Sequence, residues 1–310
     1  MTLKPIPNVT AAAPAAPVKD ESGEPVTAPK VLLMGPPGSG KTWSTSTLLA
    51  AGIEVFYLAT EPNAIDVVLD ACNKKNIPID RFHWNYVPPS TASWKSMKEV
   101  SRIINTNTYQ GVTDIKSGIE KVNSNAIMDV LNCCENFYDQ RTKKYFGDVT
   151  SWGFDRALVL DSLSGLNILA QRNTVGLKPT LAQGEWNIAM NLEEMFINKL
   201  TADMRAYFIV LAHIERNIDQ TSGRMIITPL ALGAKLGPRL GRFFSEVVLT
   251  VKDGDKFSWT TMEKNADVKQ RSLPIANGLA PSFDPVVKAF NNRLKTLHAT
   301  DSAPPAVPAA

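Results

Sequence analysis

The sequence predicts an α/β fold in which helices flank a mostly parallel central sheet. Short apolar segments alternate with longer segments of helical period through most of the chain. A glycine-rich loop joins the first apolar segment to the first helix. Parallel strands need such crossover helices, and because both of their faces are covered they appear as nearly continuous apolar runs.

The glycine-rich loop, residues 35–42, matches the phosphate-binding pattern G-x-x-x-x-G-K-[ST] at every fixed position. It follows the apolar segment 31–34 and precedes a helix expected over 43–51, which Gly52 would end. Backbone N–H groups in such a loop face one anion, and the helix N-terminus adds partial positive charge. The residues expected to bind a nucleotide are Gly35, Pro36, Pro37, Gly38, Ser39, Gly40, Lys41, Thr42 and Trp43.

Two side chains of this loop have specific expected roles. Lys41 would reach the β- and γ-phosphates of the nucleotide as a mobile point charge. The hydroxyl of Thr42 would hold Mg²⁺.

The composition is that of a soluble globular protein, with 44% hydrophobic and 20% charged residues. A net charge of +3 neither requires nor excludes a nucleic-acid partner. The three cysteines have no zinc-binding spacing and make a disulfide framework improbable. There is no apolar run of transmembrane length and no secretory apolar core, so we expect a cytoplasmic protein without a membrane contact.

The two ends of the chain are rich in Ala and Pro and lack a hydrophobic period. We expect a disordered lead over 1–28, one domain over 29–296 and a disordered tail over 297–310. Residues from about 106 to 150 exceed what a core connection needs and are interpreted as a helical insertion.

The remaining elements are assigned from apolar runs and helical stripes. Strands are expected at 53–58, 81–87, 157–161, 206–212, 246–251 and 257–262, with a hairpin turn at Asp253-Gly254 between the last two. A helix is expected over 63–72. Three further helical stripes are Trp94, Met97, Val100 and Ile104; Ile119, Val122, Ala126, Val130, Cys134 and Phe137; and Ile188, Leu192, Met195, Phe196 and Leu200.

Acidic residues follow two of these strands, at the sheet edge where α/β proteins bind ligands. Asp161 could hold Mg²⁺ through a water and orient Thr42, or it could simply cap the next helix. Glu61 could polarise an attacking water, or it could be a solvated glutamate in the turn before Pro62.

The sequence resembles the RecA/KaiC/DnaB class of P-loop ATPases in three features. These are the phosphate loop, the Glu after the second strand, and the Asp after the fourth strand that is not followed by a Glu. The sequence looks most similar to phage-encoded AAA-domain nucleotide-binding proteins, some of which are similar to recombination ATPases that act beside single-strand annealing proteins. The resemblance covers about residues 29–275. It implies a RecA-like P-loop NTPase fold, ATP and Mg²⁺ as ligands, and ATP hydrolysis.

The resemblance also suggests roles for other polar residues. His213 matches the polar sensor at the end of the fifth strand, although a core or capping histidine is an equal interpretation. Lys269 and Arg271 stand where DnaB-like ring ATPases carry a Lys-x-Arg that reaches the neighbouring subunit's γ-phosphate. A solvated basic turn would look the same, and Lys235 is a rival for this role.

The function implied is an ATPase that forms a homo-oligomeric ring or filament. It would act on single-stranded DNA in phage recombination or replication, in the cytoplasm of a bacterial host, with a phage annealing or single-strand-binding protein as a further partner. The expected DNA-facing loops hold Arg172, Lys178, Arg216 and Arg224, which are otherwise ordinary surface charge. The alternatives are a P-loop phosphotransferase acting on a small nucleotide and a nucleotide-dependent switch that does not bind DNA.

Overall fold

The structure, a computed structural model, describes residues 19–20, 23, 25–89, 91–113, 126–178, 181–218 and 223–301. Most of the predicted lead and the end of the predicted tail therefore lie outside the described residues. The same holds for Ile119 and Val122 of one predicted helical stripe.

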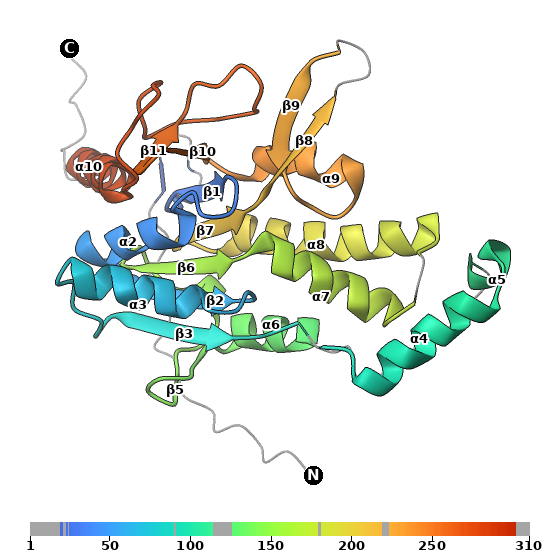
Figure 1. Cartoon of the computed structure of the whole chain (residues 1–310). Coiled ribbons are helices and arrows are strands. Elements are labelled where there is room, and N and C mark those ends of the chain that lie inside the picture. Colours follow the sequence, from blue (N-terminus) through green and yellow to red (C-terminus); the bar gives the residue numbers. More distant parts are fainter. Residues whose placement is uncertain are drawn as a thin grey trace, which may run out of the picture.

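A seven-stranded sheet forms the centre of the molecule, with the strand order β11-β10-β1-β7-β6-β2-β3 (Figure 1). All neighbouring strands are parallel except β10 and β11, which form an antiparallel hairpin. This confirms the predicted α/β class with a mostly parallel sheet and the predicted hairpin turn. The strands are β1 (Lys30–Met34), β2 (Glu54–Ala59), β3 (Phe82–Tyr86), β6 (Arg156–Asp161), β7 (Tyr207–Ala212), β10 (Glu246–Asp253) and β11 (Lys256–Thr260).

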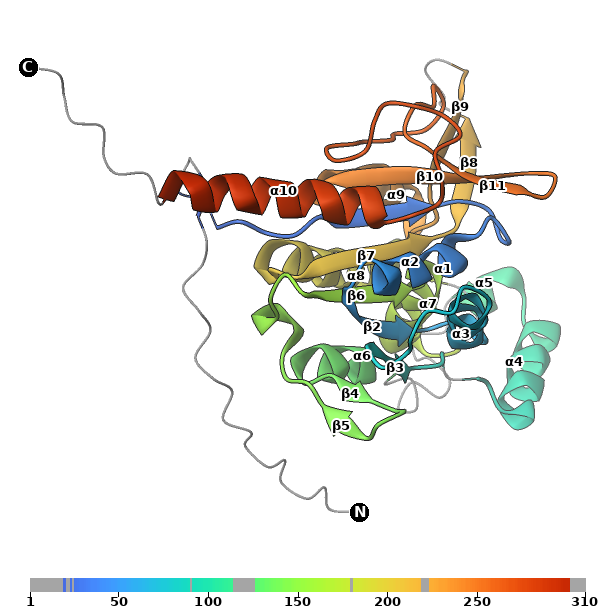
Figure 2. The ribbon, with the colours of Figure 1, turned by 90° about the vertical axis from the view of Figure 1, so that its left-hand side faces the viewer.

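Helices cover both faces of the sheet (Figures 1 and 2). Strand β1 shows the reason: Val31 and Leu33 belong to the apolar core on one face, while Leu32 and Met34 belong to the core on the other. Full burial of each such side chain stabilises the fold by roughly 1.5–3 kcal/mol. One face is packed by α2 (Ser46–Ala50), α3 (Ala64–Lys74) and α10 (Asp284–Asp301), and the other by α6 (Ala126–Glu135), α7 (Leu163–Val175) and α8 (Gln183–Asp203).

Two predicted helical stripes form helices whose apolar side chains are partly exposed. On α4 (Trp94–Thr106), Trp94 and Ile104 are 78% and 53% exposed, and the helix lies away from the sheet (Figure 1). On α8, Phe196 and Leu200 are buried, whereas Ile188 is 62% exposed. Helical spacing predicts that an apolar face exists, but only the packing decides whether the same chain covers it.

The region predicted as a helical insertion contains more than helices. It holds α5 (Tyr109–Thr113) and α6, followed by a short hairpin of β4 (Tyr138–Asp139) and β5 (Lys144–Tyr145) and by the 3₁₀ turn η2 (Val149–Ser151). Helix α6 places Ile127 and Val130 in the core that contains Leu158 of the sheet. This part of the region is therefore integrated into the main domain.

The predicted boundaries of the lead and the tail need correction. Val26, inside the predicted lead, is 2% exposed, and helix α10 extends past residue 297 to Asp301. Val286 and Phe290 of α10 pack into the core that holds Val26. This apolar contact explains why Val26 and helix α10 belong to the folded domain.

Several elements were not predicted from the sequence. A second antiparallel hairpin, β8 (Ile214–Ile218) and β9 (Met225–Pro229), leaves the sheet after β7 and is followed by α9 (Gly233–Leu240) and the 3₁₀ turn η3 (Gly241–Phe243) (Figure 1). β8 contains Glu, Arg and Asn and has no apolar run, so periodicity does not reveal it. No helix among the described residues combines the length and apolarity needed to cross a membrane.

Candidate active site

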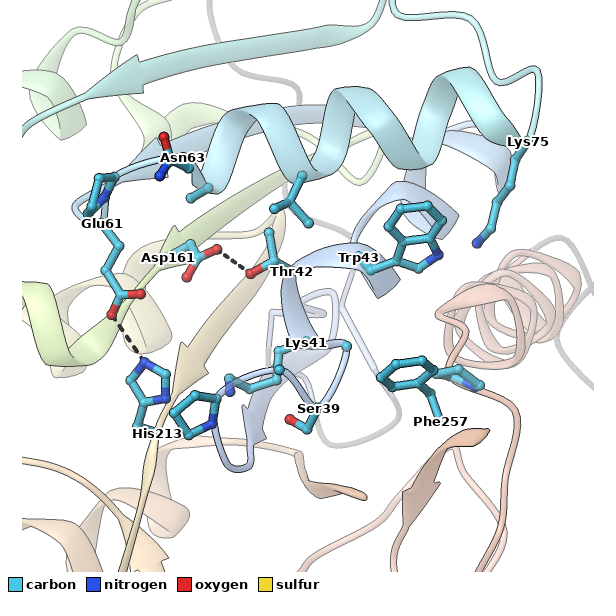
Figure 3. A pocket seen from close by; sticks show the side chains of 17 residues that line it. Ser39, Lys41, Thr42, Trp43, Glu61, Asn63, Lys75, Asp161, His213 and Phe257 are labelled. Carbon is cyan, nitrogen blue, oxygen red and sulfur yellow. Dashed lines mark hydrogen bonds and ion pairs between the residues drawn. The ribbon is translucent and has the colours of Figure 1, made fainter. Parts of the chain in front are cut away.

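A cavity of about 780 Å³ lies at the carboxyl edge of the parallel strands, where the carboxyl ends of β2, β6 and β7 meet the phosphate loop after β1 (Figure 3). The strand order explains this meeting, because β7 lies between β1 and β6, and β2 lies beside β6. The cavity brings together predicted site residues from four segments of the chain: Lys41, Thr42, Glu61, Asp161 and His213, with Pro37, Gly38, Ser39, Gly40 and Trp43 of the phosphate loop and its helix. Its volume suits a small-molecule ligand.

The phosphate loop is fixed by its glycines and by a contact with β10. Gly38 and Gly40 have φ angles of +71° and +86°, a left-handed conformation that favours glycine. A Cβ on Gly35 would lie 1.9 Å from Oγ1 of Thr250, so the loop backbone can approach β10 only because Gly35 has no side chain. The hydroxyls of Ser39 and Thr250 are 2.6 Å apart and tie the loop to the sheet.

Lys41 lies at the start of α1 (Lys41–Ser44), directly after the loop. Its Nζ donates hydrogen bonds to the carbonyl oxygens of Gly35 and Pro36 at 2.8 and 3.0 Å. Burial lowers the pKa of Lys41, and the nearby carboxylates of Asp161 and Glu61 act in the opposite direction. An anionic phosphate would offer this ammonium a stronger, charge-assisted partner than the two carbonyl groups.

Asp161 ends β6 and is 3% exposed. Its Oδ2 accepts hydrogen bonds from Thr42 Oγ1 at 2.8 Å and from the Tyr57 hydroxyl at 2.5 Å. Burial raises the pKa of Asp161, and the hydrogen bonds from Tyr57 and Thr42 partly offset this rise. The helix cap after β6 is Ser162, whose hydroxyl accepts from the backbone N–H of Gly165, so capping does not account for Asp161.

The pair Thr42 and Asp161 fits a magnesium ion. Mg²⁺ keeps several waters and takes only one or two protein oxygens when it also binds a nucleotide's phosphates. A hydroxyl and a buried carboxylate within hydrogen-bonding distance offer such a set. No group of three or more His, Cys, Asp or Glu side chains in the described chain could hold a metal ion on its own.

Glu61 follows β2 and points into the same cavity opposite His213 (Figure 3). His213 Nε2 lies 3.4 Å from Glu61 Oε1, and the same oxygen accepts a hydrogen bond from the Ser162 hydroxyl. The hydrogen bond from His213 is the largest factor that lowers the pKa of Glu61, followed by the opposing effect of burial and then by Ser162. Glu61 is thus ionised near neutral pH and is held by Ser162 and His213, which directly follow β6 and β7.

The two other predicted catalytic cations lie elsewhere. Lys269 and Arg271 line a second cavity of about 580 Å³ at the amino end of β1. Contacts with β10 hold this segment in place. The backbone of Lys269 pairs with that of Val247, and the N–H groups of Arg271 and Ser272 donate hydrogen bonds to the carboxylate of Glu246. This cavity lies beside the amino end of β1, whereas the phosphate loop follows the carboxyl end of the same strand.

The four residues expected in two DNA-facing loops lie on different kinds of structure: two are on or just after helix α7, and two are on or beside the β8–β9 hairpin. No loop follows β6, because α7 begins at Leu163 and places Arg172 in its last turn. Lys178 is paired with both carboxylate oxygens of Glu185 at 2.8 Å and is therefore not free for a ligand. Arg216 and Arg224 are exposed on and beside the β8–β9 hairpin.

The sequence did not identify Tyr57, Ser162 or Phe257 as site residues. Tyr57 and Phe257 lie within strands and appear as core residues in a pattern of apolar spacing. The only sequence signal for Ser162 was its place directly after Asp161. Their contacts with the site depend on which strands are neighbours.

No protein-family model matches the chain, and no curated protein matches it. Among solved structures, the chain is similar to one described as "Structural and biochemical analysis of a prototypical ATPase from the type III secretion system of pathogenic bacteria". The sequence identity is 10% and the TM-score is 0.37, with 73% of this chain and 53% of that chain covered. The chain thus spans about half the length of that structure, and we derive the function from the site itself.

Proposed function

We propose that this protein is a RecA-like P-loop ATPase that binds ATP with Mg²⁺ and hydrolyses it. One observation carries the proposal: Glu61 lies in the same cavity as the phosphate loop, beside the Asp161–Thr42 pair and opposite His213. A phosphate loop alone is compatible with many reactions. An ionised carboxylate held at the phosphate end of the cavity is what water activation requires.

Each residue has a role in this proposal. The loop N–H groups and Lys41 bind the β- and γ-phosphates, and Thr42 and Asp161 hold Mg²⁺, which neutralises charge that develops on the phosphates. Glu61 orients the attacking water and accepts its proton. His213, 3.4 Å from Glu61, fixes that carboxylate and is available to sense the γ-phosphate.

We propose further that the protein acts as a homo-oligomeric ring or filament. The distance of Lys269 and Arg271 from their own phosphate loop supports action in the site of a neighbouring subunit. Both side chains are exposed and could approach an adjacent nucleotide. Two cations there would stabilise charge in the transition state. Lys235, exposed on α9, stays the rival residue for this role.

The proposed substrate of this assembly is single-stranded DNA in phage recombination or replication, in the cytoplasm of a bacterial host. A phage annealing or single-strand-binding protein is the further partner proposed. The β8–β9 hairpin supports DNA binding, because it begins directly after His213 and exposes Arg216 and Arg224. The paired residues Ile218 and Met225 near its tip are 73% and 49% exposed and offer apolar contact to bases.

Phosphate release measured with and without single-stranded DNA tests the proposal. We expect Mg²⁺-dependent release that DNA increases, and a smaller increase in Arg216→Ala. Phosphate transfer to a nucleoside monophosphate would instead indicate a phosphotransferase. Nucleotide binding without turnover under either condition would indicate a nucleotide-dependent switch.

A further inference from the structure

The cavity continues past the phosphate loop on the side opposite Glu61 and His213 (Figure 3). The chemistry of its lining changes along this direction. One end carries the charged groups of Lys41, Glu61 and Asp161, whereas the aromatic rings of Trp43 and Phe257 line the other (Figure 3). A phosphate chain bound at the loop would therefore have an apolar compartment beside it.

Phe257 forms one wall of this compartment. It is 42% exposed although it is aromatic, and it lies on β11 of the β10–β11 hairpin. A Cβ built on Gly40 would be 3.1 Å from its ring carbon Cδ1, so the ring edge lies directly against the phosphate loop. The Nζ of Lys252, its cross-strand partner, is 5.5 Å from the ring centroid.

Trp43 forms the opposite wall, and Figure 3 shows its ring separated from that of Phe257 by open space. It is half-buried on α1, next to Thr42. The Nζ atoms of Lys74 and Lys75, at the end of α3, lie 5.2 and 5.8 Å from its ring centroid. Two rings from distant parts of the sequence thus border the same end of one cavity.

We propose that Trp43 and Phe257 form an aromatic clamp that stacks on the base of the bound nucleotide, and that this clamp favours purine nucleoside triphosphates. The inference rests on the proposed nucleotide-binding function and identifies its base-recognition residues. Stacking on aromatic side chains is tolerant of base identity but strengthens with the ring area, which is larger for purines.

The hydrogen-bonding groups beside the clamp agree with a purine. Lys75, which lies at this end of the cavity (Figure 3), carries an ammonium group that can only donate. Adenine and guanine share the acceptor N7.

Calorimetric titration with ATP, CTP and inorganic tripolyphosphate, each with Mg²⁺, tests the clamp. In Phe257→Ala and in Trp43→Ala we expect the affinity for ATP to fall about tenfold. The affinity for tripolyphosphate, which has no base, stays unchanged. Phe257→Tyr keeps the ring and retains ATP affinity, and Tyr145→Ala, an exposed aromatic residue on β5, serves as the control.

The possible outcomes are distinguishable. An equal loss for ATP and tripolyphosphate in Phe257→Ala would mean that the ring only supports the phosphate loop, and the clamp would be wrong. Unchanged ATP affinity in both alanine variants, or equal wild-type affinity for ATP and CTP, would also overturn it. If the wild-type protein bound neither ATP nor tripolyphosphate, the proposed ATPase function itself would fail, and the clamp with it.

Discussion

Tyr57 on β2 donates a hydrogen bond of 2.5 Å to Oδ2 of Asp161 on the adjacent strand β6. Both side chains are buried, and the same oxygen also accepts from Thr42. Since burial raises the pKa of Asp161, this carboxyl group depends on its two donors to remain ionised before a cation arrives. We therefore regard Tyr57 as a positioning residue for the proposed magnesium site.

We expect Tyr57→Phe to raise the Mg²⁺ concentration needed for half-maximal ATP hydrolysis. Loss of one donor raises the pKa of Asp161 further, so a smaller fraction is ionised at low pH. The defect should therefore grow as the pH is lowered and shrink as the pH is raised, because the raised pKa makes ionisation of Asp161 more sensitive to acid. Tyr86→Phe, the same change on neighbouring β3, is the control. A variant that loses stability but keeps the wild-type Mg²⁺ dependence would show that Tyr57 serves packing alone.

We expect Lys41→Ala to abolish hydrolysis and to weaken ATP binding strongly. The loop loses the cation proposed to reach the β- and γ-phosphates, and turnover should fall by about two orders of magnitude or more. Lys288→Ala, which changes an exposed lysine of α10, should behave as wild type. Near-normal turnover in Lys41→Ala would contradict the assignment of the phosphate loop.

Glu61→Gln should retain ATP and Mg²⁺ binding and lose most of its turnover. The amide keeps the shape of the side chain but cannot accept a proton from water, so the loss appears in kcat rather than in nucleotide affinity. The pKa of Glu61 is lowered, and the hydrogen bond from His213 is the largest cause. The contribution of Glu61 to turnover should therefore persist from neutral pH down to the pH range in which glutamate ordinarily titrates. Normal hydrolysis by this variant would exclude Glu61 as the base.

Assembly can be tested by mixing two inactive variants. Arg271→Ala should bind ATP as wild type but turn over slowly, because the lost contact forms mainly in the transition state. Lys41→Ala subunits keep an intact Lys269 and Arg271. A mixture should regain activity that neither variant has alone, since some interfaces pair an intact loop with intact cations. Mixtures that co-assemble by light scattering yet stay inactive would exclude action across the interface, and Lys235 would be tested next.

Glu193 on α8 is expected to lower stability as the pH rises. It is 1% exposed, its Oε2 accepts only from Leu232 N at 3.3 Å among the described contacts, and burial raises its pKa to about 8. Between about pH 4.5 and about pH 8, Glu193 keeps its proton in the folded state but has lost it in the unfolded state. The free energy of unfolding therefore falls as the pH rises through this range. Glu193→Gln should remove this fall, gaining up to about 1.4 kcal/mol per pH unit within that window. Urea unfolding of both proteins across the pH range measures the difference, and parallel curves would contradict the prediction.

Local sequence was sufficient for the phosphate loop and for the strands of the central sheet. In residues 35–42 the glycines and the Lys-Thr pair act through backbone conformation and short-range contacts, which depend on spacing along the chain. Apolar runs predicted the central strands β1, β6 and β7, because strands buried on both faces need nearly continuous apolar sequence. Asp161 and Glu61 were accessible as candidates because acids at strand ends share one edge of a parallel sheet.

Only the tertiary structure decided which distant residues meet at that edge. The order β1-β7-β6-β2 places Tyr57 against Asp161 and His213 opposite Glu61, and neither contact has a signal in spacing. The fold also puts Lys269 and Arg271 in a second cavity beside the amino end of β1, away from the cavity that holds the phosphate loop. Strand order is set by the summed burial of all faces of the sheet. A short sequence segment therefore determines that a strand forms and which side chains it carries. The packing of the whole chain determines which strands become its neighbours.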